Sequence, residues 1–101
     1  MFGLVVRFDL KDEAAAEAFD ALVAKTAEGI RSEPGTLLYI VNRVEGAPLS
    51  RVFYEVYADR EAFEAHEATP HVKHFLAERE QYISDLRVEF LTPTGGKGLP
   101  R

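Results

Sequence analysis

The centre of the chain, residues 36–57, reads TLLYIVNRVEGAPLSRVFYEVY, and this stretch decides the fold. Its two ends, residues 36–44 and 51–57, are rich in the β-branched and aromatic residues that strands favour. The segment 45–48 (EGAP) between them is typical of a turn. We therefore expect an antiparallel hairpin with a loop of about five residues.

The segment before the hairpin predicts one strand and one long helix. Alternate residues are apolar in the segment 2–8, which is typical of a strand with one buried face. Apolar residues then recur every three or four positions up to Ile30, so we expect a helix of about 18 residues with Asp9 or Asp12 as its N-cap. The segment 33–35 (EPG) ends that helix, because proline disfavours helical geometry in the residue before it.

The segment after the hairpin predicts a helix in two pieces and a last strand. Asp59 is the expected N-cap of a short helix over residues 60–67. The segment 69–70 (TP) restarts the helix, since threonine is a good N-cap and proline is favoured at the first helical position. Apolar residues alternate again over residues 86–90. Residues 92–101 hold two prolines and three glycines without an apolar period, and we expect a loose tail there.

The order of elements is therefore β-α-β-β-α-β, with the second helix broken in two. This order favours the α+β class: a four-stranded antiparallel sheet with the helices on one face, the ferredoxin-like arrangement. A chain of 101 residues, of which 47% are apolar and 29% charged, has the size and balance of one globular domain. We assign that domain to residues 1–91.

Composition removes several classes of function. The net charge of −5, with no basic run, argues against nucleic acid or an anionic membrane as the partner. The chain has no cysteine, which excludes disulfides and thiolate chemistry. Its longest apolar run near the start, Leu4 to Val6, is too short for a signal core or a membrane span, so we expect a cytoplasmic protein. Phosphate-binding glycine loops, dinucleotide fingerprints and serine nucleophile elbows are also missing.

Both faces of the predicted strands carry apolar residues, although helices can cover only one face. Leu38 and Ile40 point away from Tyr39 and Val41, and the strand over residues 51–57 shows the same division. A sheet with one wetted face alternates more cleanly. We expect the second face to pack on another copy of the chain as a homodimer; the alternative is a monomer with a few exposed large residues.

Three histidines lie close together in the sequence and are candidates for chemistry. His66 follows Phe63 by three residues, so it shares the inward face of the short helix. His71 stands at the start of the restarted helix, where a cation is disfavoured and a neutral imidazole could accept a proton. His74 could simply pair with Glu78. A metal held by His71 and His74, with His66 or Glu67 as third ligand, is not expected, because the spacing fits zinc helices poorly.

Aromatic residues crowd the hairpin and its neighbouring helices. Apolar walls with histidines and tyrosine hydroxyls suit a small, flat aromatic ligand. Two charges stand in the middle of strands, Arg7 and Glu55, and they could face each other as an ion pair, or Glu55 could lie in the dimer interface. The aromatic candidates are Tyr39, Phe53, Tyr54, Tyr57, Phe63 and Phe75.

Three segments together resemble the antibiotic biosynthesis monooxygenase family. They are SEPGTLLY at 32–39, YEVYADREAFEAH at 54–66 and ATPH at 68–71, and the likeness runs over residues 1–91. The resemblance implies a ferredoxin-like fold, a dimeric α/β barrel and a pocket between sheet and helices. The family includes cofactor-independent quinol or anthrone monooxygenases, haem-degrading enzymes and a sugar-phosphate isomerase.

The resemblance also implies which residues carry function. His66 and His71 match the two family histidines, Glu55 matches the strand glutamate, and Tyr57 stands where many members have tryptophan. Haem breakdown is disfavoured, because the first strand lacks the asparagine of the haem-degrading branch.

The function that we expect is oxygenation of a quinol, an anthrone or a similar electron-rich aromatic by O₂, without a cofactor. His66 is assigned as the base, with His71 and Tyr57 orienting or stabilising the oxyanion. The expected substrate-binding residues are Glu55, Tyr39, Phe63 and Phe75. The alternatives are an isomerase that uses the same histidine as a proton shuttle, and a small-molecule-binding or structural dimer without turnover.

Overall fold

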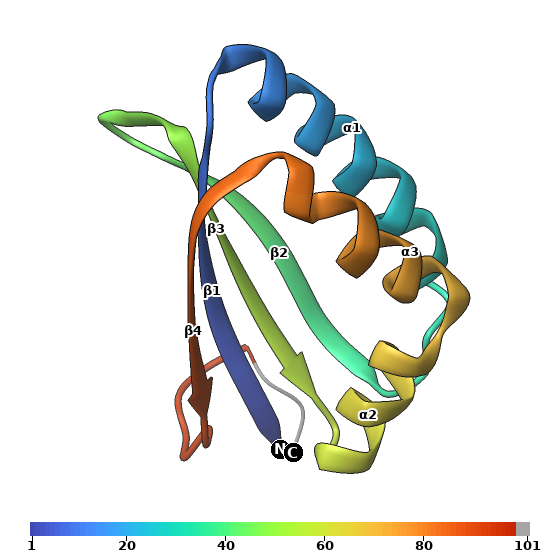
Figure 1. Cartoon of the computed structure of the whole chain (residues 1–101). Helices are drawn as coiled ribbons and strands as arrows, with labels where there is room; N and C mark the ends of the chain where they lie inside the picture. The colour runs from blue at the N-terminus through green and yellow to red at the C-terminus, as the bar shows by residue number, and fades with distance from the viewer. Residues whose placement is uncertain (99–101) are drawn as a thin grey trace.

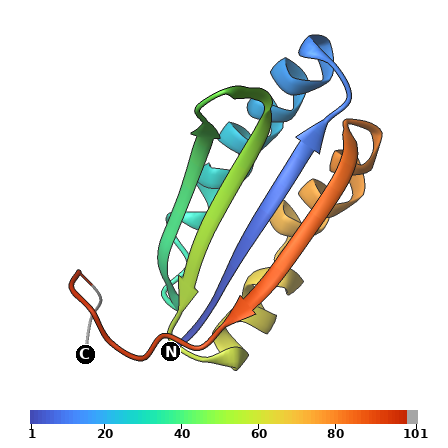
Figure 2. The same ribbon diagram turned by 90° about the vertical axis from the view of Figure 1, so that its left-hand side faces the viewer.

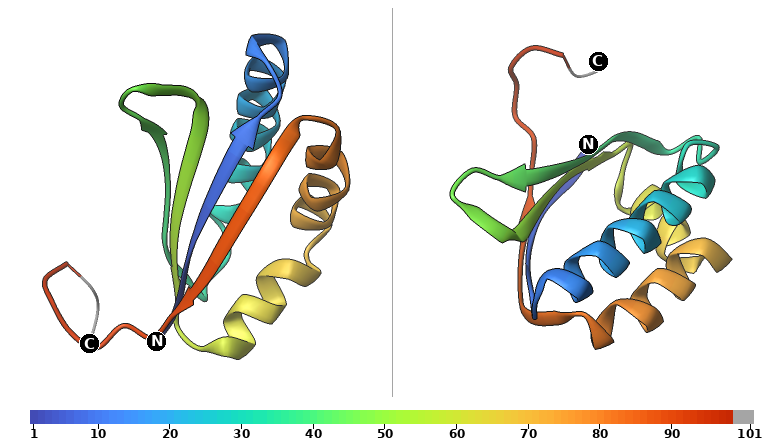
Figure 3. Two further views of the ribbon diagram at one scale, coloured as in Figure 1. Left: turned by 60° about the vertical axis from the view of Figure 1, so that its left-hand side comes forward. Right: turned by 90° about the horizontal axis from the view of Figure 1, so that it is seen from above.

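A computed structural model describes residues 1–98 and forms one layer of sheet and one layer of helices (Figure 1). The four strands join in one antiparallel sheet of order β2-β3-β1-β4, and the three helices cover one of its faces (Figures 2 and 3). The predicted ferredoxin-like α+β fold is confirmed. The elements are β1 (Phe2–Leu10), α1 (Glu13–Ile30), β2 (Thr36–Val44), β3 (Ala47–Tyr57), α2 (Arg60–Ala68), α3 (Pro70–Glu78), the short 3₁₀ helix η1 (Arg79–Gln81) and β4 (Ile83–Leu91).

The helices begin at capping residues that the sequence identifies. Asp12 accepts a hydrogen bond from the Ala15 amide at 2.8 Å, and Asp59 does the same for Ala62. Thr69 separates α2 from α3, and Pro70 opens α3 at a position where its missing amide hydrogen costs nothing. The second helix is therefore bent at Thr69, as the sequence predicts.

One expectation about the hairpin is wrong, and one open alternative is removed. The loop is shorter than five residues: β3 already begins at Ala47, because Gly46 adopts a positive φ of 79° and closes the turn. Of the two alternatives for Arg7 and Glu55, the ion pair between them is not formed. Arg7 lies opposite Val52 on the outer face, where it binds Asp9 and Ser50, whereas Glu55 is on the helix-covered face.

The core fills the layer between sheet and helices. Phe8 on β1 is the hub of its aromatic part, with ring centroids 5.1 Å from Phe19 and 4.8 Å from Phe53, distances at which aromatic rings attract each other. Phe75 on α3 closes the cluster from the helix side, 5.8 Å from Phe19. This cluster holds α1 and α3 against the middle of the sheet.

An arginine, Arg51, is also buried between the sheet and the helices, beyond the aromatic cluster and toward the hairpin turn. The Arg51 side chain is only 3% exposed, and its guanidinium donates two hydrogen bonds to Asp20 on α1, at 2.8 and 3.0 Å. Two more go to the carbonyls of Pro48 and Ser50. Arg51 therefore links β3 to α1, and the Asp20 carboxylate balances its charge.

The predicted tail over residues 92–101 begins directly after β4, and its last three residues lie outside the described part of the chain. Residues 92–98 form neither helix nor strand and lead away from the sheet at the end of β4 (Figure 3). No helix within residues 1–98 has both the length and the hydrophobicity needed to cross a membrane.

Candidate active site

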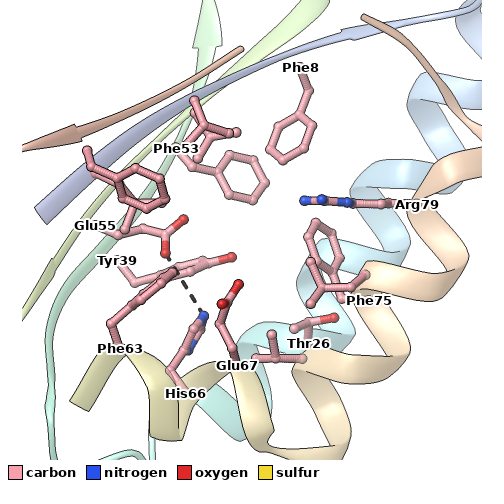
Figure 4. Close-up of a pocket in the computed structure, with 16 residues that line it drawn as sticks. Phe8, Thr26, Tyr39, Phe53, Glu55, Phe63, His66, Glu67, Phe75 and Arg79 are labelled. Atoms are coloured by element: carbon pink, nitrogen blue, oxygen red, sulfur yellow. Dashed lines mark ion pairs between the residues drawn. The ribbon is translucent and has the colours of Figure 1, made fainter. Parts of the chain in front are cut away.

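A cavity of about 120 Å³ lies between the sheet and the helices, on the side of the core that α2 covers (Figure 4). Its walls are mostly apolar and aromatic, with six polar residues in the lining. Val88 and Phe90 form the wall along β4, and the Phe90 side chain is 60% exposed, so the cavity approaches the surface there. The six polar residues are Thr26, Tyr39, Glu55, His66, Glu67 and Arg79.

His66 on α2 is buried at the floor of this cavity and is held in a fixed orientation. Its Nδ1 lies 2.7 Å from Oε1 of Glu33, three residues after the end of α1. The Glu33 carboxylate also accepts from the Thr36 hydroxyl at 2.6 Å and lies 2.5 Å from Nε2 of His71. Because an ionised Glu33 can only accept, Nδ1 of His66 carries a proton, and in the neutral ring Nε2 is the atom with the free lone pair.

Glu33 is stabilised as a carboxylate despite its position. Burial alone would raise its pKa, but the hydrogen bonds from Thr36, His66 and His71 together lower it. An ionised carboxylate behind a histidine keeps the ring in one tautomer and stabilises the imidazolium that forms when the ring takes up a proton.

Nε2 of His66 faces Glu55 on β3. The closest carboxylate oxygen, Oε1, is 4.0 Å from Nε2, too far for a direct hydrogen bond (Figure 4). A ligand hydroxyl placed between them could reach both at about 2.8 Å each. The pair is therefore spaced to handle one proton of a bound molecule.

Burial raises the pKa of Glu55 to about 7, and the nearby Glu67 and Glu33 charges act in the same direction. The hydrogen bond from the Tyr57 hydroxyl, 2.6 Å from Oε1, opposes this shift. A carboxyl group that titrates near neutral pH can both give and take a proton during a reaction.

Tyr39 on β2 points its hydroxyl into the cavity (Figure 4). Burial, together with the charges of Glu55 and Glu33, raises its pKa well above the ordinary value, so the hydroxyl keeps its proton. Burial likewise raises the pKa of Tyr57. Both tyrosines are therefore hydrogen-bond donors at neutral pH.

The sequence assigns seven residues to catalysis or substrate binding. The structure places five of them in the cavity wall and two behind it. Tyr57 is fully buried beneath Glu55, and His71 lies on the far side of Glu33. The His71 ring packs so closely on α1 that a Cβ atom at Gly29 would lie 2.5 Å from it. The five wall residues are Tyr39, Glu55, Phe63, His66 and Phe75.

The third histidine, His74, lies outside the cavity, and the metal site that would include it can also be compared with the structure. His74 is exposed on α3, away from the cavity wall. Among residues 1–98, His, Asp and Glu side chains form no group of three or more that could hold a metal ion.

Two polar residues of the site were not identified from the sequence. The sequence around Glu33 indicates only the end of a helix, although Glu33 bridges two histidines more than 30 positions away. Arg79 does carry a sequence signal: it follows Val72, Phe75 and Leu76 at helical spacing, on the apolar face of α3. A charge on that face points into the core layer.

Fold and site define a ferredoxin-like α+β protein with a histidine-bearing cavity between its sheet and its helices. The chain belongs to the antibiotic biosynthesis monooxygenase family, whose model matches residues 1–78. No curated protein matches the sequence.

Solved structures agree with this assignment. The chain is similar to Rv0793 from Mycobacterium tuberculosis, with a TM-score of 0.88 and 22% identity over 96% of this chain and 98% of that one, a likeness that shows the fold. A structure described as an antibiotic biosynthesis monooxygenase is 25% identical, with a TM-score of 0.85, over 94% of this chain and all of that one. Protein SO0527 from Shewanella oneidensis is 26% identical, with a TM-score of 0.82, over 89% and 87% of the two chains.

Proposed function

We propose that the chain is an oxygenase that needs no cofactor and acts with O₂ on a one-ring quinol or a similar electron-rich aromatic. The observation that carries this proposal is the setting of His66, whose Nδ1 is held by the Glu33 carboxylate while Nε2 faces an aromatic-walled cavity. Family membership supports it, because a monooxygenase activity gives the family its name.

The chemistry needs a base and a dry, aromatic site more than it needs a cofactor. Triplet O₂ reacts slowly with a closed-shell quinol, but a phenolate gives up one electron far more easily. His66 Nε2 takes the proton of the quinol hydroxyl, the phenolate transfers an electron to O₂, and superoxide combines with the ring carbon radical to form a C–O bond.

The resulting ring peroxide then loses water. One oxygen atom stays on the ring as the oxygen of a hydroxyquinone, the other leaves as water, and the quinol has supplied all four electrons. Cleavage of the O–O bond requires a proton at the leaving oxygen. Glu55, with its pKa of about 7, is suited to deliver it.

His71 and Tyr57 contribute to this scheme through their neighbours. His71 holds the far oxygen of Glu33 and thereby fixes the carboxylate that orients His66. Tyr57 donates to Glu55 and fixes the carboxyl group that faces the substrate. Both act as positioning residues, whereas His66 and Glu55 are the catalytic residues.

The size of the cavity favours a quinol over an anthrone. An engineered protein cavity of about 150 Å³ accepts benzene. The cavity of about 120 Å³ is of that order, so it suits one ring rather than three fused rings. Phe63 and Phe75 on the helix side provide faces for a flat ring.

The test is oxygen consumption with hydroquinone, followed by mass spectrometry of the product formed under ¹⁸O₂. We expect one labelled oxygen atom in a hydroxyquinone and no hydrogen peroxide. His66→Gln should lower kcat by about 10²- to 10⁴-fold. His74→Gln, a change of the same kind at an exposed histidine of α3, is the control and should leave kcat unaltered.

Two results would reject the oxygenase, and a third would reject its assigned base. Turnover that continues without O₂ would favour the proton-shuttling isomerase. Ligand binding without any product would favour a binding protein. Equal kcat values for wild type and His66→Gln would remove the assigned base.

We also propose that the active form is a homodimer joined through the outer face of the sheet. Ile40 and Tyr54 are exposed on that face, beside the half-buried Leu38, Val5 and Val52. Burying such a patch is favourable by roughly 25 cal/mol per Å². Sedimentation should give a mass near twice 11.3 kDa, and Ile40→Glu should halve it. A monomeric wild type at micromolar concentration would contradict this proposal.

A further inference from the structure

Arg79 is the one cation in the cavity wall that the proposed reaction leaves unused. It is the first residue of η1, and its side chain is 18% exposed. The guanidinium carbon lies 5.6 Å from the ring centroid of Phe8 and 5.7 Å from that of Phe75, and the group points into the cavity (Figure 4). Two aromatic rings therefore hold the cation in place.

The hydrogen-bonding capacity of Arg79 is not met within the described residues. Its Nε atom is buried and has no hydrogen-bond partner. The nearest carboxylate oxygen belongs to Glu80, 3.9 Å from Nε, and the Glu80 side chain is 68% exposed to water. A buried N–H group without an acceptor costs free energy, and a guanidinium in this position stays charged at neutral pH.

Glu67 lines the same cavity and points into it, but it forms no ion pair with Arg79 in residues 1–98 (Figure 4). It would repel an anion that lies next to it. An anionic group of a ligand is therefore best placed at the end of the guanidinium that points into the cavity, on the side away from Glu67 (Figure 4). Such a group would supply acceptors for the terminal nitrogens of the guanidinium, which point into the cavity and form no hydrogen bond within residues 1–98, whereas Nε itself stays buried.

We propose that Arg79 binds a carboxylate on the aromatic substrate, so that the substrate class is a one-ring quinol carboxylate. The inference rests on the proposed function for the quinol part and on Arg79 alone for the carboxylate part. Hydroxyl and carboxylate then occupy different walls: the hydroxyl lies between His66 and Glu55, and the carboxylate lies at Arg79. A planar guanidinium suits a carboxylate because it can donate two parallel hydrogen bonds.

The test is calorimetric titration under nitrogen, where no oxidation takes place. The ligands are 2,5-dihydroxybenzoate and its neutral counterpart 2,5-dihydroxybenzamide, which has nearly the same shape. We expect wild type to bind the carboxylate about 10- to 100-fold more tightly than the amide, the range of a hydrogen bond to a charged group. Arg79→Met should remove this preference while amide binding persists.

A matched control and a second variant keep the result unambiguous. Arg87→Met removes an exposed arginine of β4 on the other face of the sheet and should keep the carboxylate preference. Arg79→Lys keeps the charge without the fork of donors and should retain part of the preference. Equal affinity of wild type for carboxylate and amide, no carboxylate binding at all, or an undiminished preference in Arg79→Met would each overturn the proposal.

The two proposals fail in different ways. Arg79-dependent carboxylate binding without ¹⁸O incorporation would reject the oxygenase and keep the anion subsite. Oxygenation of hydroquinone with the same kcat/KM as its carboxylate would reject the subsite and keep the oxygenase.

Discussion

Arg51 and Arg79 both lie in the layer between sheet and helices, yet their surroundings are opposite. Arg51 donates four hydrogen bonds, two of them to the Asp20 carboxylate. Arg79 has a buried Nε without a partner, and its guanidinium lies over two phenylalanine rings beside a cavity. The hydrogen bonds of Arg51 are made within the protein, whereas Arg79 has N–H donors without acceptors.

The same contrast extends to the acidic groups of the two regions. Asp20 faces its cation directly, whereas Glu55 faces a histidine across a gap of 4.0 Å and has its pKa raised to about 7 by burial. Folding alone gains nothing from a buried carboxyl group that is poorly stabilised as an anion. The region around Arg51 therefore stabilises the fold, whereas the region around His66 and Arg79 is the one that we propose binds a ligand.

The largest effect on stability is expected from Asp20→Asn. The change leaves the buried Arg51 cation without an anion, so the free energy of unfolding should fall by about 3 kcal/mol, the lower end for breaking a buried pair because Asp20 is partly exposed. Urea denaturation measures this. Asp85→Asn, at an exposed aspartate of β4, should change it by less than about 0.5 kcal/mol. If both variants lowered the free energy of unfolding equally, the Arg51–Asp20 ion pair would not stabilise the fold as proposed.

A smaller, pH-dependent effect is expected at Glu55. Because its pKa in the folded state is about 7, above the usual value of 4.5, the folded state retains a proton that the unfolded state has lost between those two values. Wild-type stability relative to Glu55→Gln should therefore decline as the pH rises through this window and level off above it. We expect a decline of roughly 2 kcal/mol between about pH 5.5 and about pH 8, measured by urea denaturation. A difference that does not change with pH would contradict the raised pKa.

The smallest effect on stability is expected from Arg79→Met. The change removes an unpaired buried donor and keeps an apolar side chain between Phe8 and Phe75. The free energy of unfolding should stay within about 1 kcal/mol of wild type or increase. Thermal unfolding of the variant beside Asp20→Asn shows the contrast directly. A loss as large as that of Asp20→Asn would make Arg79 a structural residue like Arg51.

Local patterns in the sequence predict most of this fold, because strand alternation, helical spacing and capping residues act over a few positions. Asp12, Asp59 and Thr69 cap the helices where their sequence context indicates. The hairpin loop was overestimated because the conformation of one glycine, Gly46, decided its length.

The site could be predicted only in part. His66 was placed inward by its spacing from Phe63, and it is buried in the structure. Glu55 alternates with Phe53 and Tyr57, which is a signal for the covered face, but its raised pKa depends on burial that only the packing of the helices on the sheet creates. Glu33 reaches His66 and His71 only through the folded chain, and no local pattern contains that contact.

The central claim is that His66 presents an unprotonated Nε2 to a ligand-binding cavity while Glu33 holds the proton on Nδ1. Long-range ¹H–¹⁵N correlation spectra of the histidine side chains at about pH 8, recorded under nitrogen with and without hydroquinone, test it most directly. We predict the Nδ1–H tautomer for His66 and a shift of its Nε2 signal on addition of hydroquinone, with His74 unaffected. A proton on Nε2 in the free protein, or a His66 spectrum that ignores the ligand, would contradict the claim.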